Sequence, residues 1–251
     1  MPKLLQINKS KTFDNFFTKG SDRTIKYVVL HHIADENLNR AIENLKFHQV
    51  SSHYIIDDNG EIWQLVADHD IAYQAGVSFW DGTVNLNETS IGIEFFSKNP
   101  EEIGFTKAQM KSGLQLCKML VEKYQIAPKN VVGHSDIAFD RQTGFLNRKD
   151  DPSHLFDWKF LAKNGIGIFP KIKKDFKDKI QFQLGDKNSE ILNLKKSLKK
   201  FGYKIDNLND EFDEEFKNLA IVFNRRFNKD KYLLDKDKWF ISSSKILNVI
   251  I

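Results

Sequence analysis

Hydrophobic positions in the first 135 residues switch repeatedly between strand-like runs and helical spacing. Runs rich in β-branched residues predict strands, and Asn59-Gly60 supplies the tight turn of a hairpin. The expected strands cover residues 25–31, 54–56, 62–65, 90–96 and 129–133. Apolar residues three and four apart predict helices at residues 37–49 and 107–124, the second with Thr106 as its N-cap. This alternation predicts an α/β fold, with a mixed central β-sheet flanked by helices.

The pattern changes after about Pro170. Residues 171–179 are rich in lysine and poor in apolar residues, as in a linker or an exposed helix. Two amphipathic helices then surround the turn-like Phe201-Gly202-Tyr203. We therefore expect one domain at residues 1–170, a linker at 171–180 and a small, mostly helical domain at 181–251.

Composition narrows the class of protein. The chain has 251 residues, 41% hydrophobic and 29% charged, which is typical of a globular protein. The single Cys117 excludes an internal disulfide, and its place in a helical apolar stripe indicates a buried structural thiol. No apolar stretch is long enough to span a bilayer. Residues 1–24 hold no continuous apolar run, so no secretory signal is expected.

Two histidines and one aspartate are the strongest candidates for chemistry. His31 follows the apolar run Val28–Leu30, and His134 follows 131–133; Asp151 lies in a polar segment. Two imidazoles and one carboxylate form a catalytic zinc set that leaves the fourth position for water. A lone histidine is more often a hydrogen-bonded core residue, but three candidate ligands, each on its own motif, favour a metal. We therefore expect a metal-dependent hydrolase with one Zn²⁺ per chain.

Six segments in order carry a family resemblance. They are Val-Val-Leu-His (28–31), Val-Ser-Ser-His-Tyr (50–54), Gly-Glu-Ile-Trp-Gln (60–64), Asn-Glu-Thr-Ser-Ile-Gly-Ile-Glu (87–94), Val-Val-Gly-His-Ser-Asp-Ile-Ala (131–138) and Arg-Lys-Asp-Asp-Pro (148–152). Together they resemble the zinc-dependent N-acetylmuramoyl-L-alanine amidases of the AmpD/AmiD type, the amidase-2 family. That family shares its fold with the peptidoglycan recognition proteins.

The resemblance implies a role for each matching residue. His31, His134 and Asp151 fall on the zinc ligands, Glu94 on the catalytic glutamate, and Lys149 on the lysine that assists at the oxyanion. A carboxylate can move the proton of an attacking water to the leaving amine, and a lysine can stabilise developing negative charge. The alternatives are a capped sheet edge for Glu94 and a surface salt bridge for Lys149.

The implied reaction is hydrolysis of the amide between N-acetylmuramic acid, or its 1,6-anhydro form, and L-alanine. His53, Gln74 and Asn87 are expected to line the substrate cleft, with hydrogen bonding as an alternative for His53. Peptidoglycan or muropeptides are the expected partners, and nucleic acid is not expected to bind. We expect no transmembrane segment and a monomeric protein. Recycling of anhydro-muropeptides would place the enzyme in the cytoplasm, and cleavage of intact wall would place it in the periplasm or outside the cell.

Three features depart from the family pattern. Tyr73–Gly76 replaces Trp-His-Ala-Gly, so Gln74 stands where the family often has histidine. Ser153 replaces the glycine of Asp-Pro-Gly, and residues 139–147 form a longer link than usual. Residues 194–203 loosely resemble a three-helix peptidoglycan-binding module, for which a purely stabilising domain is the alternative.

Two other functional classes compete with the enzyme. A recognition module that binds muropeptides without cutting them typically lacks part of the zinc set, whereas all three candidate ligands and Glu94 are present here. A nucleic-acid-binding protein would rest on the net charge of +4 and on a basic helical face. The lysines of that face are Lys195, Lys196, Lys199 and Lys200. Such a face is usually only solvated.

Overall fold

The computed structural model describes residues 5–20, 22–173 and 175–251. Residues 1–4 and 21 of the N-terminal stretch, and Lys174 of the expected linker, lie outside the described residues. The chain forms two compact units, and each draws on more than one stretch of sequence. The first contains the described residues up to Gly76 together with Asn85–His134 and Asp151–Gly167. The second contains Val77–Val84, Ser135–Asp150 and the described residues from Ile168 to Ile251.

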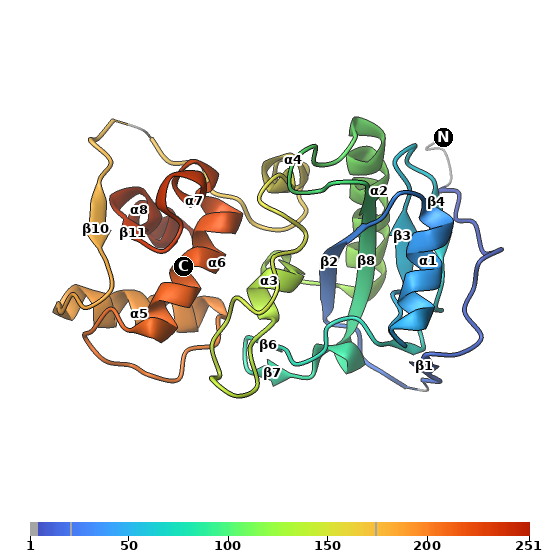
Figure 1. Ribbon diagram of the computed structural model, residues 1–251, viewed down its shortest axis with the longest axis horizontal. Helices are drawn as coiled ribbons and strands as arrows, with labels where there is room; N and C mark the ends of the chain where they lie inside the picture. Colours follow the sequence, from blue (N-terminus) through green and yellow to red (C-terminus); the bar gives the residue numbers. More distant parts are fainter. Residues whose placement is uncertain (1–4, 21, 174) are drawn as a thin grey trace. The chain divides into compact units, whose positions relative to one another are not determined.

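A five-stranded sheet forms the centre of the first unit (Figure 1). Its strand order is β4-β3-β8-β2-β9, and only β4 runs antiparallel to its neighbour. The strands are β2 (Tyr27–Ala34), β3 (Tyr54–Ile56), β4 (Ile62–Gln64), β8 (Ser90–Ser97) and β9 (Val131–Gly133). The predicted mixed sheet is therefore confirmed.

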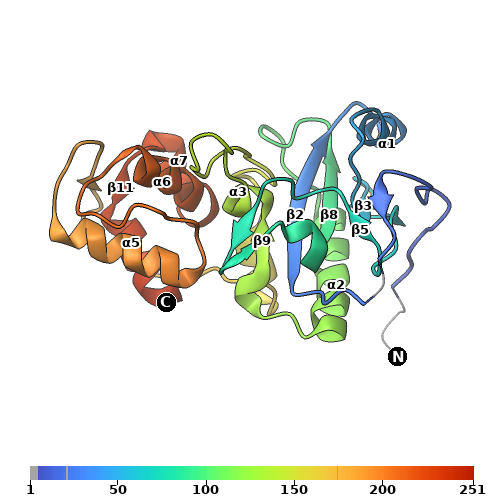
Figure 2. The same ribbon diagram turned by 90° about the horizontal axis from the view of Figure 1, so that it is seen from below.

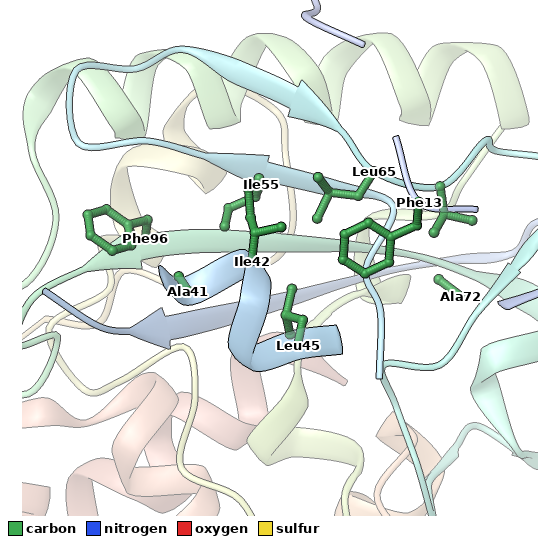
Figure 3. Packing of buried hydrophobic residues seen from close by; sticks show 9 residues of the cluster. Phe13, Ala41, Ile42, Leu45, Ile55, Leu65, Ala72 and Phe96 are labelled. Carbon is green, nitrogen blue, oxygen red and sulfur yellow. The ribbon is translucent and has the colours of Figure 1, made fainter. Parts of the chain in front are cut away.

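Helices α1 (Leu38–Phe47) and α2 (Lys107–Tyr124) cover opposite faces of this sheet (Figures 1 and 2). Adjacent residues of a strand point to opposite faces. Phe96 of β8 therefore belongs to the apolar cluster beneath α1 (Figure 3), whereas the Phe95 ring lies against Gly113 of α2. Helix α2 begins at the predicted Thr106 cap, which forms a capping box with Gln109.

Several short elements complete the first unit, and the sequence pattern predicted none of them. They are β1 (Phe17–Thr18), β5 (Ile71–Ala72), the 3-10 helices η1 (Leu86–Thr89) and η2 (Pro128–Asn130), and α4 (Trp158–Lys163). Strand β1 pairs with β5. A further short helix, α3 (His134–Ile137), starts directly after β9, and all of it except His134 belongs to the second unit. Two to six residues are too few to show a periodicity.

The second unit is mostly helical. It contains the predicted helices as α5 (Ser189–Phe201) and α6 (Glu214–Phe227), followed by α7 (Lys229–Asp235) and α8 (Ile241–Ile250). Strand β10 (Ile180–Phe182) pairs with β11 (Trp239–Phe240), and β6 (Phe79–Trp80) forms a hairpin with β7 (Thr83–Val84). The Trp80 indole contacts the rings of Phe201 and Tyr203 edge to face. These aromatic contacts tie the hairpin to the C-terminal helices.

Helix α6 also holds the segment 135–150 within the second unit. Arg226 pairs with the buried Asp136 carboxylate, which accepts a second hydrogen bond from the Tyr203 hydroxyl at 3.1 Å. Arg225 donates to the Asn147 side chain at 3.0 Å and to the Lys149 carbonyl at 3.2 Å. In neither unit is any helix among the described residues both long and apolar enough to cross a bilayer.

Candidate metal centre

His31, His134 and Asp151 converge on one point in the first unit. One candidate ligand atom from each residue lies within 4.8 Å of the other two. The Asp151 Oδ2 atom is 3.0 Å from His31 Nδ1 and 3.1 Å from His134 Nδ1. All three side chains are buried. The structure thus brings together the three residues that the sequence assigned to a metal.

Strand register explains why the two histidines meet. In the parallel pair β2–β9, Leu30 is the register partner of Gly133. The next residue of each chain segment is a histidine, so the imidazoles start from adjacent positions, and their ring centroids are 4.5 Å apart. The expected strand ended at residue 31, whereas β2 continues to Ala34. His31 therefore lies inside the strand, which fixes its backbone.

The two histidines favour the ionised form of the Asp151 carboxyl. Burial alone would raise the pKa of this carboxyl, but His134 and His31 hold the pKa well below its ordinary value of 3.8 through charge and hydrogen bonding. The centre therefore contains an anionic oxygen between two imidazole nitrogens. This is a donor set that suits a divalent cation.

The far side of each imidazole is also held. His31 Nε2 lies 2.5 Å from Gln74 Oε1, and His134 Nε2 lies 3.1 Å from the Ala75 carbonyl oxygen. Two consecutive residues, Gln74 and Ala75, therefore provide the oxygen atoms that face the two imidazole rings. The sequence reading missed Ala75, because a backbone carbonyl leaves no signal in residue type.

Glu94 lies beside His31. The two are register partners in the parallel strands β8 and β2, so their side chains project from the same face of the sheet. Ile55 on β3 is the register partner of Glu94 on its other side. Ile55 and Phe96 belong to the cluster under α1, which places Glu94 on that face of the sheet. Glu94 is buried, with 7% of the residue exposed.

Asn87 supports the segment that holds the imidazoles. Its Oδ1 atom accepts hydrogen bonds from the backbone N–H groups of Gln74 at 3.1 Å and Ala75 at 2.7 Å. The Gln74 amide in turn donates to Ser90 Oγ at 2.7 Å. The polar atoms of Asn87 and Gln74 named here are therefore engaged within the protein. Ser90 is a further residue that the sequence reading missed.

The expectation that His53 lines a substrate cleft needs correction. His53 is fully buried. Its Nδ1 accepts from the Gly92 N–H at 3.0 Å, and its Nε2 lies 3.1 Å from the Asp70 carbonyl oxygen. Burial and the charge of Arg23 lower the pKa of His53 to about 3, so the ring is neutral. His53 instead ties β8 to the 67–70 turn, in line with its alternative hydrogen-bonding role.

Lys149 belongs to the second unit, whereas the three candidate ligands and Glu94 belong to the first. Its side chain is exposed, and its backbone carbonyl is the group that Arg225 holds.

Ser153 occupies the position of the family glycine with a glycine-like backbone. Its φ is +92°, a region that L-residues rarely adopt. The Ser153 hydroxyl donates to the Pro100 carbonyl at 2.9 Å and accepts from the Leu155 N–H at 3.0 Å. These two bonds hold the turn that follows Asp151.

Residues 21–154 match the family described as Amidase_2, N-acetylmuramoyl-L-alanine amidase. The chain belongs to this family. The resemblance drawn from the six sequence segments is thereby confirmed, and all of the residues that gather around the candidate metal centre lie inside the matched region.

Curated relatives include two amidases of Escherichia coli (strain K12). The chain is 38% identical to the N-acetylmuramoyl-L-alanine amidase AmiD over 164 residues, which is 60% of this chain and 56% of AmiD. It is 37% identical to the 1,6-anhydro-N-acetylmuramyl-L-alanine amidase AmpD over 110 residues, or 44% of this chain and 55% of AmpD. The match therefore spans little more than half the length of either relative.

Solved structures with the same fold include those of AmiD and AmpDH3. One is the complex of E. coli AmiD with the substrate anhydro-N-acetylmuramic acid-L-Ala-D-γ-Glu-L-Lys, with a TM-score of 0.73 and 29% identity over 90% of this chain and 88% of that chain. The other is AmpDH3 from Pseudomonas aeruginosa, with a TM-score of 0.70 and 25% identity over 90% of this chain and 91% of that chain. The predicted fold class, a mixed sheet with flanking helices and a C-terminal helical portion, is confirmed by these neighbours.

Proposed function

We propose that this protein is a zinc-dependent hydrolase of the amide between N-acetylmuramic acid, or its 1,6-anhydro form, and L-alanine. The observation that supports this proposal most strongly is that His31, His134 and Asp151 converge beside Glu94 within the matched family region. The relatives AmiD and AmpD are named as amidases of N-acetylmuramoyl-L-alanine and of its 1,6-anhydro form, which supports this amide bond as the one that is cleaved.

The donor set fits a cation on chemical grounds. The Ala75 carbonyl oxygen can only accept, so His134 Nε2 carries a proton. In a neutral ring the other nitrogen, Nδ1, then presents a lone pair to the Asp151 carboxylate 3.1 Å away. Electron-rich atoms this close require positive charge between them, from a ring proton or from a metal ion. Two imidazoles and one carboxylate are a known ligand set for catalytic zinc.

Zinc held by these residues would polarise the scissile carbonyl and lower the pKa of a coordinated water to about 7. Glu94, next to His31 on the same sheet face, takes the proton of the attacking water and returns it to the departing L-alanine nitrogen. Lys149 is proposed to stabilise the negative charge that develops on the carbonyl oxygen.

Zinc content and amine release test this proposal together. We expect about one zinc per purified chain, and release of L-alanine amino groups from peptidoglycan that a chelator abolishes and added zinc restores. Asp151→Ala should lose both properties, and His69→Ala, a change at a histidine with 71% side-chain exposure, should lose neither. Muropeptide binding without amine release would instead indicate a recognition module and overturn the hydrolase.

The division into an amidase domain at residues 1–170, a linker at 171–180 and a peptidoglycan-binding-like domain at 181–251 also stands as a proposal. Cosedimentation of the full chain with insoluble peptidoglycan tests the wall-binding part. Substitution of exposed side chains on α7, such as Leu233 and Leu234, should reduce cosedimentation without changing hydrolysis of a soluble muropeptide.

A further inference from the structure

We infer that Gln74 is a positioning residue that fixes the tautomer of His31 and thereby tunes the affinity of the centre for its metal. This inference rests on the proposed function and deepens it. It also replaces the expectation that Gln74 serves as a substrate-cleft residue.

The hydrogen-bond chain around Gln74 determines which end of its amide faces His31. The Ser90 hydroxyl lies 2.6 Å from the Leu86 carbonyl, and only the hydroxyl can donate in that pair. The proton of Ser90 is thus used, so its oxygen accepts from Gln74 Nε2 at 2.7 Å. The Gln74 Oε1 atom must then be the end that faces His31 Nε2.

An amide oxygen only accepts, so His31 Nε2 must carry the proton. In the neutral ring, Nδ1 is left with its lone pair directed at the Asp151 side of the centre. That is the nitrogen a metal needs, and the other nitrogen is held as a donor to a fixed oxygen. A carboxamide does not titrate near neutral pH, so Gln74 Oε1 remains an acceptor there.

The protein holds Gln74 in place from two directions. Asn87 Oδ1 binds the backbone N–H groups of both Gln74 and Ala75, so one side chain anchors the acceptors of both imidazoles. Gly92 on β8 leaves room for the Gln74 side chain, because a Cβ there would lie 2.7 Å from Gln74 Cγ. The backbone anchor from Asn87 and the space above Gly92 therefore both hold Gln74 in contact with His31.

The test measures zinc affinity by competition with a chromophoric chelator. Gln74→Leu keeps the approximate size but removes the acceptor, and we expect the zinc dissociation constant to rise by about 10–100-fold. Gln74→Glu keeps an acceptor oxygen, so it should bind zinc at least as tightly as the parent chain. Gln115→Leu, the same change at an exposed position of α2, is the matched control and should leave the affinity unchanged.

Parent-like zinc affinity in a folded Gln74→Leu variant would overturn the inference and leave the proposed hydrolase intact. Absence of zinc binding by the parent chain would instead remove the proposed function itself. If Gln74→Leu does not fold, long-range ¹H–¹⁵N spectra of the zinc-loaded parent chain decide the matter. A proton on His31 Nε2 supports the inference, and a proton on His31 Nδ1 overturns it.

Discussion

His31 and Glu94 are register partners on the neighbouring parallel strands β2 and β8. A candidate metal ligand and a candidate proton carrier therefore project side by side from one face of the sheet, at a separation fixed by the backbone ladder. Both side chains are buried, so the pair is rigid and largely shielded from water. Rigid placement of this kind is what proton transfer to and from a reacting group requires.

Glu94→Gln should abolish hydrolysis without removing the metal. The amide keeps the shape of the carboxylate but cannot accept a proton, so we expect the rate to fall by about 10²–10⁴-fold. Zinc content by elemental analysis should stay at the parent value, because Glu94 is not one of the three ligands. Glu102→Gln, the same change at an exposed position, should have no effect on either quantity. Undiminished turnover in Glu94→Gln would remove Glu94 as the proton carrier.

At Ser153, glycine should be tolerated better than alanine. Either substitution removes the hydroxyl that binds Pro100 and Leu155, at a cost of about 1–3 kcal/mol in unfolding free energy. The unfolding free energy of the glycine variant should be about 1 kcal/mol higher than that of the alanine variant, because glycine adopts a φ of +92° without strain and alanine does not. Urea unfolding of the two variants measures the difference directly. An alanine variant as stable as the glycine variant would show that the backbone stores no strain here.

The pair formed by Asp136 and Arg226 should be strongly coupled. Both side chains are almost fully buried, so Arg226→Met leaves the Asp136 carboxylate without this guanidinium and should cost about 3–5 kcal/mol. Asp136→Asn keeps an acceptor for Tyr203 and should also destabilise the second unit. The double variant should lose less than the sum of the two single losses, as a double-mutant cycle by chemical unfolding would show. Strict additivity would mean that the two charges do not interact.

Asp68 should make the first unit sensitive to acid. Burial would raise the pKa of this carboxyl, but hydrogen bonds from Tyr54, Lys123 and Tyr124 hold the pKa below its ordinary value of 3.8. A depressed pKa in the folded state contributes stability above about pH 4, and this contribution is lost as the pH falls through the folded-state pKa. Asp68→Asn should therefore be less stable than the parent chain at pH 7, and the gap should narrow near pH 3. A gap that does not change with pH would exclude this linkage.

The sequence predicted the longer elements because they repeat a clear period. The strand at 54–56 and the helix at 107–124 lie where the pattern placed them. The strand expected at 129–133 begins only at Val131, because residues 128–130 form the 3-10 helix η2. Helix α8 was missed, because its serine-rich first turn hides the apolar face. The association of Trp80 with the C-terminal helices was also missed, since contacts between rings more than a hundred residues apart leave no periodicity.

Of the candidate site, the sequence predicted the groups whose residue type carries the chemistry. His31, His134 and Asp151 are in this class, and the structure brings them together. The acceptors on the far side of the imidazoles were not predicted, because one is the backbone oxygen of Ala75 and the other is an amide read as a substrate contact. His53 was misplaced because a motif does not reveal which of its side chains is buried.

Mass spectrometry of the products from anhydro-N-acetylmuramic acid-L-Ala-D-γ-Glu-L-Lys, the substrate in the AmiD complex, is the most direct test of the proposed hydrolase. The purified chain should yield free anhydro-N-acetylmuramic acid and a tripeptide with an unblocked L-alanine amino group, and a chelator should stop both products from forming. Parallel digestion of intact peptidoglycan would show which of the two substrates is preferred. An uncut substrate with zinc bound to the protein, or cleavage at any other bond, would contradict the account.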